Sequence, residues 1–249
     1  MRPVTKWTVG HISPSRKTVS AVYNPHGLAK PLLEENLDDF CNYCEVFSSD
    51  SEVEHIVSQH ENPLLSTDWT NFLLACGRCN GSDNKSNKRV DLSAMYFPHL
   101  NNTLLVFKYL EGGLVRIQPN LTAQHQKDKA NALLDLVGLD KYPGNPKYPV
   151  TTKHLQGFPV NDKRWHHRRR AWEEAVRKLA KYEDGHISVE DVSKFAHQRG
   201  FFSVWFSVFA AHKAVKEALV NIFKGTARDC FDADFNPIPR NPNDLIDTI

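Results

Sequence analysis

The arrangement of four cysteines constrains this chain more than any other feature of its sequence. Cys41 and Cys44 form one CxxC pair, Cys76 and Cys79 form a second, and 31 residues separate the two pairs. A CxxC turn places two thiolates on one metal ion, and two such turns complete the tetrahedral sulfur site that zinc prefers. Because four protein ligands leave no open coordination position, we expect a structural zinc ion. The long insertion between the pairs must then form an element of its own.

The rest of the composition is that of an ordinary globular protein. Hydrophobic residues make up 41% and charged residues 24% of the 249 residues, enough for one large domain or two small ones. The fifth cysteine, Cys230, is expected to be a buried apolar residue. The first residues lack the apolar segment of a signal peptide, and the apolar run at residues 201–211 is too short to span a bilayer. We therefore expect a cytoplasmic protein without membrane contact.

Charge is unevenly distributed along the chain. Residues 1–100 contain 9 basic and 12 acidic residues, a net charge of −3, whereas residues 101–249 contain 22 and 17, a net charge of +5. The overall charge of +2 therefore hides an acidic first part and a basic second part. Any attraction for nucleic-acid phosphate must come from local patches.

The strongest basic cluster is KRWHHRRR at residues 163–170. On a helix, Arg164 and Arg168 share one face and Arg169 lies next to it. Such a face could bind a phosphate backbone without reading its sequence. A solvated helix face with salt bridges is the alternative explanation of the same cluster.

Hydrophobic periodicity and turn residues predict an α+β fold. The expected elements of the first part are a helix at 30–40, strands at 51–57 and 69–75, a short helix after Cys79, a β-hairpin at 103–118 and a helix at 127–138. The hairpin turns at Glu111-Gly112-Gly113, which is a favourable tight-turn sequence. Residues 1–26 show little periodicity and are expected to be irregular.

The second part is expected to be mostly helical. Asp162 can cap a helix that reaches about Tyr182, and Ser188 with Asp191 forms a capping box for the next helix. Residues 202–224 are apolar on one face and are expected to be helical up to Gly225. A proline-rich linker is expected at 143–162. These elements suggest one unit at residues 1–118, which contains both cysteine pairs and the β-hairpin, and a mostly helical region at 119–249.

The insertion between the cysteine pairs carries Glu54 and His55 side by side. Hydrolysis of a phosphodiester needs a base that activates water, and neutral histidine serves near pH 7. It also needs a divalent ion such as Mg²⁺, which is held by a few oxygen ligands. The carboxylate of Glu54 could be one of these ligands. Adjacent residues in a strand point to opposite faces of the sheet. Glu54 and His55 can therefore serve one site only if they lie at a strand end or at a bend. Without the cysteines and Asn80, an exposed strand pair would be the better interpretation.

Two asparagines and two lysines extend this constellation. The amide of Asn71 could hold the loop after His55 by bonding to its backbone, although a purely structural asparagine fits the position as well. Asn80 follows the last cysteine, where it could cap a helix or supply a second oxygen ligand to a metal. Lys85 and Lys88 follow Asn80 in the sequence.

These residues resemble a known family. The strings CNYC, VEHI and NFLLACGRCN are similar to the zinc-stabilised HNH (ββα-metal) endonuclease core. With MRPV at the start and NNT near residue 102, the similarity extends over residues 1–110 to HNH nucleases of bacterial antiphage defence operons. Such nucleases act beside an SMC-like or ABC-type ATPase, as in Septu and some retron systems. The resemblance implies a ββα-metal nuclease core followed by a mostly α-helical region.

The resemblance also implies a role for each residue. His55 would be the general base, Glu54 and Asn80 the ligands of one Mg²⁺ or Mn²⁺ ion, and Asn71 the residue that orients the active-site loop. The four cysteines would hold the structural zinc. Lys85 and Lys88 would be the candidates for contact with nucleic-acid phosphate, although relatives carry this lysine nearer to the asparagine. The expected products carry 5′-phosphate and 3′-hydroxyl ends, the expected substrate is DNA with RNA not excluded, and the expected partner is an ATPase from the same operon.

Two other interpretations remain open. A zinc-stabilised interaction module that has lost catalysis would keep the cysteines without needing Glu54, His55 and Asn80. A stand-alone restriction-type HNH nuclease would need an element that reads bases, and the sequence has no recognisable helix-turn-helix or further zinc finger. The sequence does not decide between DNA and RNA, nor does it give sequence preference, trigger or stoichiometry.

Overall fold

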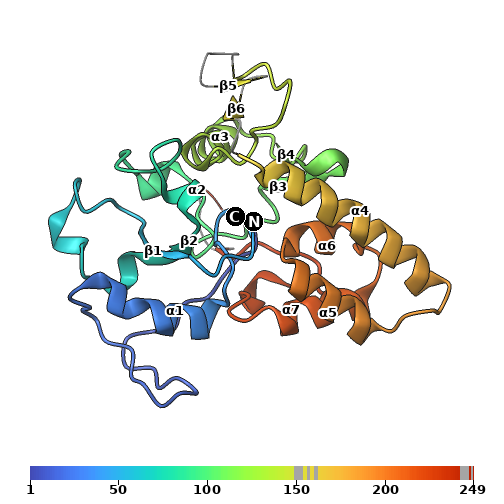
Figure 1. Ribbon diagram of the computed structural model, residues 1–249, viewed down its shortest axis with the longest axis horizontal. Helices are drawn as coiled ribbons and strands as arrows, with labels where there is room; N and C mark the ends of the chain where they lie inside the picture. Colours follow the sequence, from blue (N-terminus) through green and yellow to red (C-terminus); the bar gives the residue numbers. More distant parts are fainter. Residues whose placement is uncertain (149–153, 156–157, 160–161, 242–246, 248) are drawn as a thin grey trace.

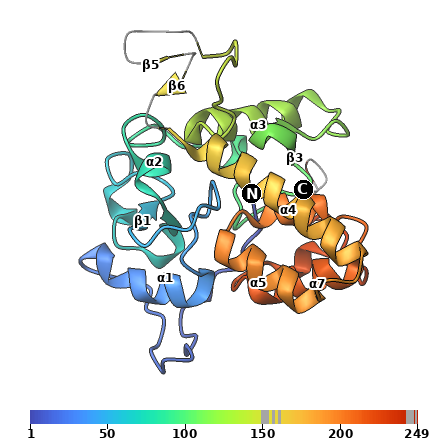
Figure 2. The same ribbon diagram turned by 45° about the vertical axis from the view of Figure 1, so that its right-hand side comes forward.

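The computed structural model describes residues 1–148, 154–155, 158–159, 162–241, 247 and 249. Within these residues the fold is α+β, as predicted, with three separate two-stranded antiparallel sheets and several helices. Residues 26–80 lie on one side of the molecule and residues 164–222 on the other (Figure 1). Figure 2 shows the same separation from a second direction.

The first part contains a strand–strand–helix unit. Strand β1 (Glu52–His55) pairs antiparallel with β2 (Phe72–Ala75), and the chain continues into the short helix α2 (Gly77–Asn80). Both strands are shorter than predicted, and in β2 the first three predicted residues form the 3₁₀ turn η3 (Trp69–Asn71) instead. All four β2 residues are buried. A lone two-stranded sheet is marginally stable, so this unit depends on its neighbours.

Helix α1 (Lys30–Leu37) supplies part of that packing. It follows the 3₁₀ turn η1 (His26–Ala29) and packs against β2 through apolar side chains that include Leu33. The predicted helix at 30–40 ends three residues early because Asp38 adopts a positive φ of 64° while its N–H bonds to Glu34. This turn directs the chain toward the first cysteine pair.

The predicted hairpin and the helix after it are present. Strands β3 (Phe107–Leu110) and β4 (Leu114–Ile117) pair across the turn η5 (Glu111–Gly113), and α3 (Gln124–Val137) follows. Gly113 has a φ of +74°, and a Cβ at this position would lie 2.3 Å from the carbonyl oxygen of Trp165. Glycine is therefore required for the close approach of the turn to the next helix.

The second part is helical, with α4 (Arg164–Glu183), α5 (Val189–Arg199), α6 (Phe202–Val208) and α7 (Lys213–Ile222). Asp162 accepts hydrogen bonds from the backbone and side chain of Arg164 at the start of α4. The capping box of Ser188 and Asp191 opens α5, as predicted.

The prediction of one helix over residues 202–224 is wrong. The helix breaks at Phe209, which leaves helical geometry with φ −93° and ψ 26°, and α7 begins only at Lys213. Five of the seven residues of α6 are buried, whereas α7 buries one face. The break lets α6 pack against α4 while α7 packs against α5, which a straight helix could not do.

The predicted linker at 143–162 is described only in part. Residues 149–153, 156–157 and 160–161 lie outside the described residues, and between them β5 (His154–Leu155) pairs with β6 (Phe158–Pro159). Among the described helices, none has the length and apolar character needed to cross a membrane.

Residues before position 118 contact residues after it at several places. The backbones of Val4 and Thr226 form a β-bridge, and Phe201 N–H donates to the carbonyl of Glu45. One cluster of buried side chains contains Leu73 of β2 together with Phe201 near α6. The division into residues 1–118 and 119–249 remains a prediction.

Candidate functional site

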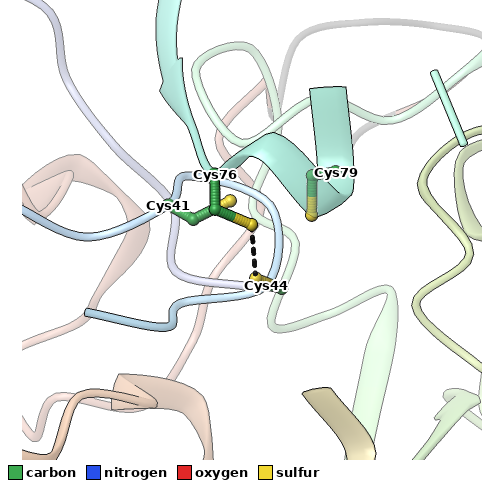
Figure 3. Close-up of side chains that lie close together, drawn as sticks. All are labelled: Cys41, Cys44, Cys76 and Cys79. Atoms are coloured by element: carbon green, nitrogen blue, oxygen red, sulfur yellow. Dashed lines mark hydrogen bonds between the residues drawn. The ribbon is translucent and has the colours of Figure 1, made fainter. Parts of the chain in front are cut away.

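The four paired cysteines meet in one buried cluster. Their sulfur atoms all lie within 4.8 Å of one another, and Cys44 Sγ is 3.7 Å from Cys76 Sγ. Cys41 and Cys44 come from one loop, whereas Cys76 and Cys79 come from the end of β2 and from α2 (Figure 3). Two sulfurs bound at about 2.3 Å to a tetrahedral zinc would be about 3.8 Å apart. The donor set and its spacing therefore fit a structural zinc ion.

The charge around this cluster also suits a cation. Burial raises the pKa of the Cys41 and Cys79 thiols well above the ordinary value, so positive charge is needed to hold them as thiolates. Arg164 of α4 donates through Nη1 to Cys79 Sγ at 3.1 Å. The same guanidinium donates to the carbonyls of Val137 and Gly138 and pairs with Asp162 at 2.7 Å.

His55 is the last residue of β1 and is half-buried. Its Nε2 lies 2.9 Å from the carbonyl oxygen of Ser66. A carbonyl oxygen only accepts, so Nε2 carries the proton and neutral His55 keeps Nδ1 as its free acceptor. Burial lowers the pKa of His55 below its ordinary value of 6.5, which favours the neutral ring near pH 7. This arrangement suits a base that takes a proton through Nδ1.

Asn71 holds the loop that carries these groups. Its Oδ1 accepts from Val57 N–H at 2.8 Å, and its Nδ2 donates to the carbonyls of Val57 and Leu65 at 2.9 and 3.1 Å. Asn71 thus spans both ends of the loop between His55 and Ser66. Its amide has the backbone-bonding role that the sequence suggested.

Glu54 is fully buried beside His55. Its Oε1 pairs with Lys85 Nζ at 2.7 Å and accepts from the hydroxyl of Tyr43 at 3.3 Å, while Oε2 has no hydrogen-bond partner among the described residues. Burial raises the pKa of Glu54 to about 7, although the Lys85 ammonium acts in the opposite direction. A buried carboxylate oxygen without a partner is a position that a divalent cation would fit.

Asn80 ends α2 and lies at the same cavity. Its Nδ2 donates to Glu52 Oε2 at 2.7 Å, which leaves Oδ1 as a possible ligand oxygen. Sequence reasoning missed Glu52, although a signal existed: residues two apart in a strand lie on the same face, and Glu52 precedes Glu54 by two. Glu52 therefore adds a second carboxylate to the site.

Lys85 and Lys88 differ in their surroundings. Lys85 is 1% exposed, pairs with Glu54 and donates to the carbonyl of His55. This placement gives its ammonium a partner inside the protein, but Lys85 also lines the cavity described below, so its contact with nucleic acid stays a prediction. Lys88 is exposed, and its contact with nucleic acid stays a prediction.

The basic cluster on α4 also needs correction. Arg164 and Arg168 share a face as expected, but that face points into the protein, where they are 5% and 1% exposed. Arg168 donates to the carbonyls of Gly113 and Leu139. The expectation that both bind a phosphate backbone is therefore wrong, since neither guanidinium reaches the surface. Arg169 pairs with Glu173 at 3.3 Å and remains partly exposed.

A cavity of about 530 Å³ joins the site residues. Its lining contains Glu54, His55 and Asn80, so the strand end at His55 does bring adjacent residues to one site. Its wall also contains His26 and Lys30, which sequence reasoning missed. The remaining lining residues are Gly27, Ser51, Glu52, Val53, Ser58, Gln59, Lys85, Ser86 and Asn87.

Comparison with known proteins agrees with this geometry. The model of the HNH endonuclease family matches residues 41–86, which run from the first cysteine through the loop after α2. No curated protein gives a significant match to the chain. Residues 41–86 are therefore similar to the HNH endonuclease domain, and the four-cysteine cluster within them is suited to zinc.

Proposed function

We propose that this protein is a metal-dependent endonuclease that hydrolyses DNA phosphodiester bonds. The observation that carries the proposal is His55: its Nε2 is bonded to the Ser66 carbonyl, and the ring lines the same cavity as Glu54 and Asn80. A merely structural zinc module has no need for a histidine held in one tautomer beside two oxygen ligands.

The residues present fit a divalent ion. Glu54 Oε2 and Asn80 Oδ1 would hold Mg²⁺ or Mn²⁺, and Glu52 is near enough to Asn80 to orient it. When bound, the ion would neutralise charge that develops on the phosphate and on the leaving oxygen. Lys85 balances part of the charge of Glu54 in the protein itself.

His55 would then act as the general base. Its Nδ1 takes a proton from water, the water oxygen forms a bond to phosphorus, and the bond from phosphorus to O3′ breaks. The released O3′ oxyanion takes a proton from solvent water. These steps leave a 5′-phosphate and a 3′-hydroxyl. The Ser66 carbonyl keeps the ring oriented and stabilises the imidazolium that forms, while Asn71 fixes the loop that carries this carbonyl.

The test is cleavage of supercoiled plasmid with Mg²⁺ or Mn²⁺ by the wild-type protein and by His55→Ala. Removal of a general base is expected to slow cleavage by about 10²-fold or more. His60→Ala is the matched control, because His60 is exposed and does not line the cavity. Zinc content and circular dichroism must stay unchanged in both variants. Equal rates for wild type and His55→Ala would contradict the proposal.

A zinc-stabilised interaction module without catalysis is the second candidate. The ion pair between Glu54 and Lys85 favours it, because a buried carboxylate paired with lysine can be purely structural. The plasmid experiment separates the two candidates, since a module without catalysis cleaves under no metal condition.

We further propose that the nuclease is the effector of an antiphage defence system under the control of an ATPase from the same operon. The support is the resemblance of residues 1–110 to nucleases of this kind. The plasmid experiment should be repeated with the neighbouring ATPase added. Activity that changes with the ATPase and its nucleotide would support the proposal, and indifference to it would contradict the control by that partner.

A further inference from the structure

The cavity wall formed by residues 26–30 lies outside the matched nuclease segment. This wall belongs to η1 and the first residue of α1, which contact β1 and β2. The His26 ring stands edge-on to the His55 ring, with 4.6 Å between their centroids. The HNH match begins only at Cys41, so neither His26 nor Lys30 belongs to the matched core.

The charges of the cavity are unevenly placed. Glu52 and Glu54 supply negative charge near the expected ion, and the ammonium of Lys85 is enclosed against Glu54. Among the described lining residues, Lys30 is the one other lysine or arginine. A phosphate bound at the ion would still have an oxygen that needs a donor from the protein. The wall at residues 26–30 can supply it.

Both side chains can donate a hydrogen bond to a phosphate oxygen. Lys30 Nζ pairs with Glu34 at 3.4 Å, with both side chains about a third exposed. Exposed helix pairs of this kind contribute little, because both charges remain solvated, so a phosphate oxygen competes well for the ammonium. His26 carries a ring N–H in either neutral tautomer, and its ring lines the cavity beside the base.

We propose that His26 and Lys30 form a phosphate-binding subsite that holds the sugar–phosphate backbone of the substrate strand against His55. The inference rests on the proposed nuclease function and names how the substrate is held. Contacts of this type fix the position of a strand but read no bases. The subsite therefore favours low sequence specificity at the point of cleavage.

Binding is measured separately from cleavage in the His55→Ala background. Fluorescence anisotropy of a labelled DNA duplex with Mg²⁺ gives the dissociation constant over about 50–200 mM salt. Lys30→Gln removes the cation, and His26→Phe keeps an aromatic ring at this position but removes its N–H. We expect each change to weaken binding by about tenfold. Lys30→Gln should also lower the slope of log K against log salt by about 0.9.

Lys194→Gln is the matched control for Lys30→Gln. Lys194 is an exposed lysine in an i,i+4 pair with Glu190 on α5, the same kind of pair that Lys30 forms with Glu34. It should leave both the affinity and the salt slope unchanged. Thermal unfolding of every variant identifies losses that come from misfolding.

The outcomes separate this inference from the nuclease proposal. If the wild type cleaves plasmid but Lys30→Gln and His26→Phe bind duplex like the parent, the subsite is refuted and the nuclease stands. If the wild type never cleaves but both variants weaken binding, the nuclease proposal fails, and His26 and Lys30 stand as a backbone-binding subsite without a cleavage role. Absence of any duplex binding by the parent overturns the subsite as well.

Discussion

Glu54 is a fully buried carboxylate of which one oxygen is paired with Lys85 and the other has no partner among the described residues. Removing one member of a buried ion pair commonly costs about 3–5 kcal/mol, because the other charge stays behind without compensation. Replacing both members by neutral groups often costs little. This difference lets the structural and the metal-binding roles of Glu54 be measured apart.

We predict that Glu54→Gln lowers the free energy of unfolding by about 3 kcal/mol and abolishes cleavage. The double variant Glu54→Gln/Lys85→Met should recover most of the stability, since no buried charge is left unpaired, but none of the cleavage. Urea unfolding and plasmid cleavage over a series of Mg²⁺ concentrations provide the two measurements. A stable double variant that cleaves at the wild-type rate would show that Glu54 is not a metal ligand.

For single residues, the sequence predicts those members of the site whose partners in the site are close in the chain. The four cysteines follow from two short spacings, and the alternation of β1 contains enough information to place Glu52 beside Glu54. His26 and Lys30 have no such signal, because they reach the cavity only through the packing of η1 and α1 on the sheet. Tertiary packing therefore decides the part of the site that local patterns cannot show.

Helix α4 is the element that links the cysteine cluster to the helical part. Its first residue, Arg164, donates to Cys79 Sγ and to the carbonyls that end α3. Groups that bond to a metal ligand commonly change metal affinity by about 10–100-fold when they are removed. The periodicity of α4 indicated correctly that Arg164 and Arg168 share a face, but it could not show that the face is buried.

We predict that Arg164→Met releases zinc to a chelator at least about tenfold faster than the wild type, because a guanidinium no longer offsets the charge of the thiolates. Arg170→Met is the matched control, since Arg170 is exposed on the same helix. Asp162→Asn should lower stability but retain zinc, because it leaves the bond from Arg164 to Cys79 in place. The prediction would be contradicted if the rate of zinc release in the three variants depended only on how much stability each has lost.

The helical region shows where element prediction reaches its limit. Capping signals are local, so Ser188 with Asp191 correctly marks the start of α5. Residues 202–213 contain no glycine or proline, so the sequence gives no local signal for the break after α6. It follows instead from the need to bury Trp205 and Phe209 in one cluster with Leu219 of α7. A pattern that is helical throughout can thus be divided by the core that it must fill.

At the scale of the whole molecule, charged groups of the first part find their partners in the second. The carboxylate of Glu45, which follows Cys44, accepts from Ser203 N–H at 2.9 Å and from the hydroxyl of the same residue. Arg2 donates to Thr226 Oγ1 at 2.9 Å and to the carbonyl of Leu37 at 2.7 Å. Both charged residues are buried, 3% exposed each.

We predict that a fragment of residues 1–118 does not fold alone, although it contains the entire HNH match. Without the helical part, Glu45 would lose its partners at Ser203, and Phe201 would no longer fill the core beside β2. A buried polar group that loses its partners costs about 1–3 kcal/mol, more when it is charged, and domains are only marginally stable. Calorimetry should show one cooperative transition for the full chain and none for the fragment, which should also bind zinc more weakly. A fragment that unfolds cooperatively and cleaves plasmid would instead establish residues 1–118 as an independent nuclease domain, with the helices free for other roles.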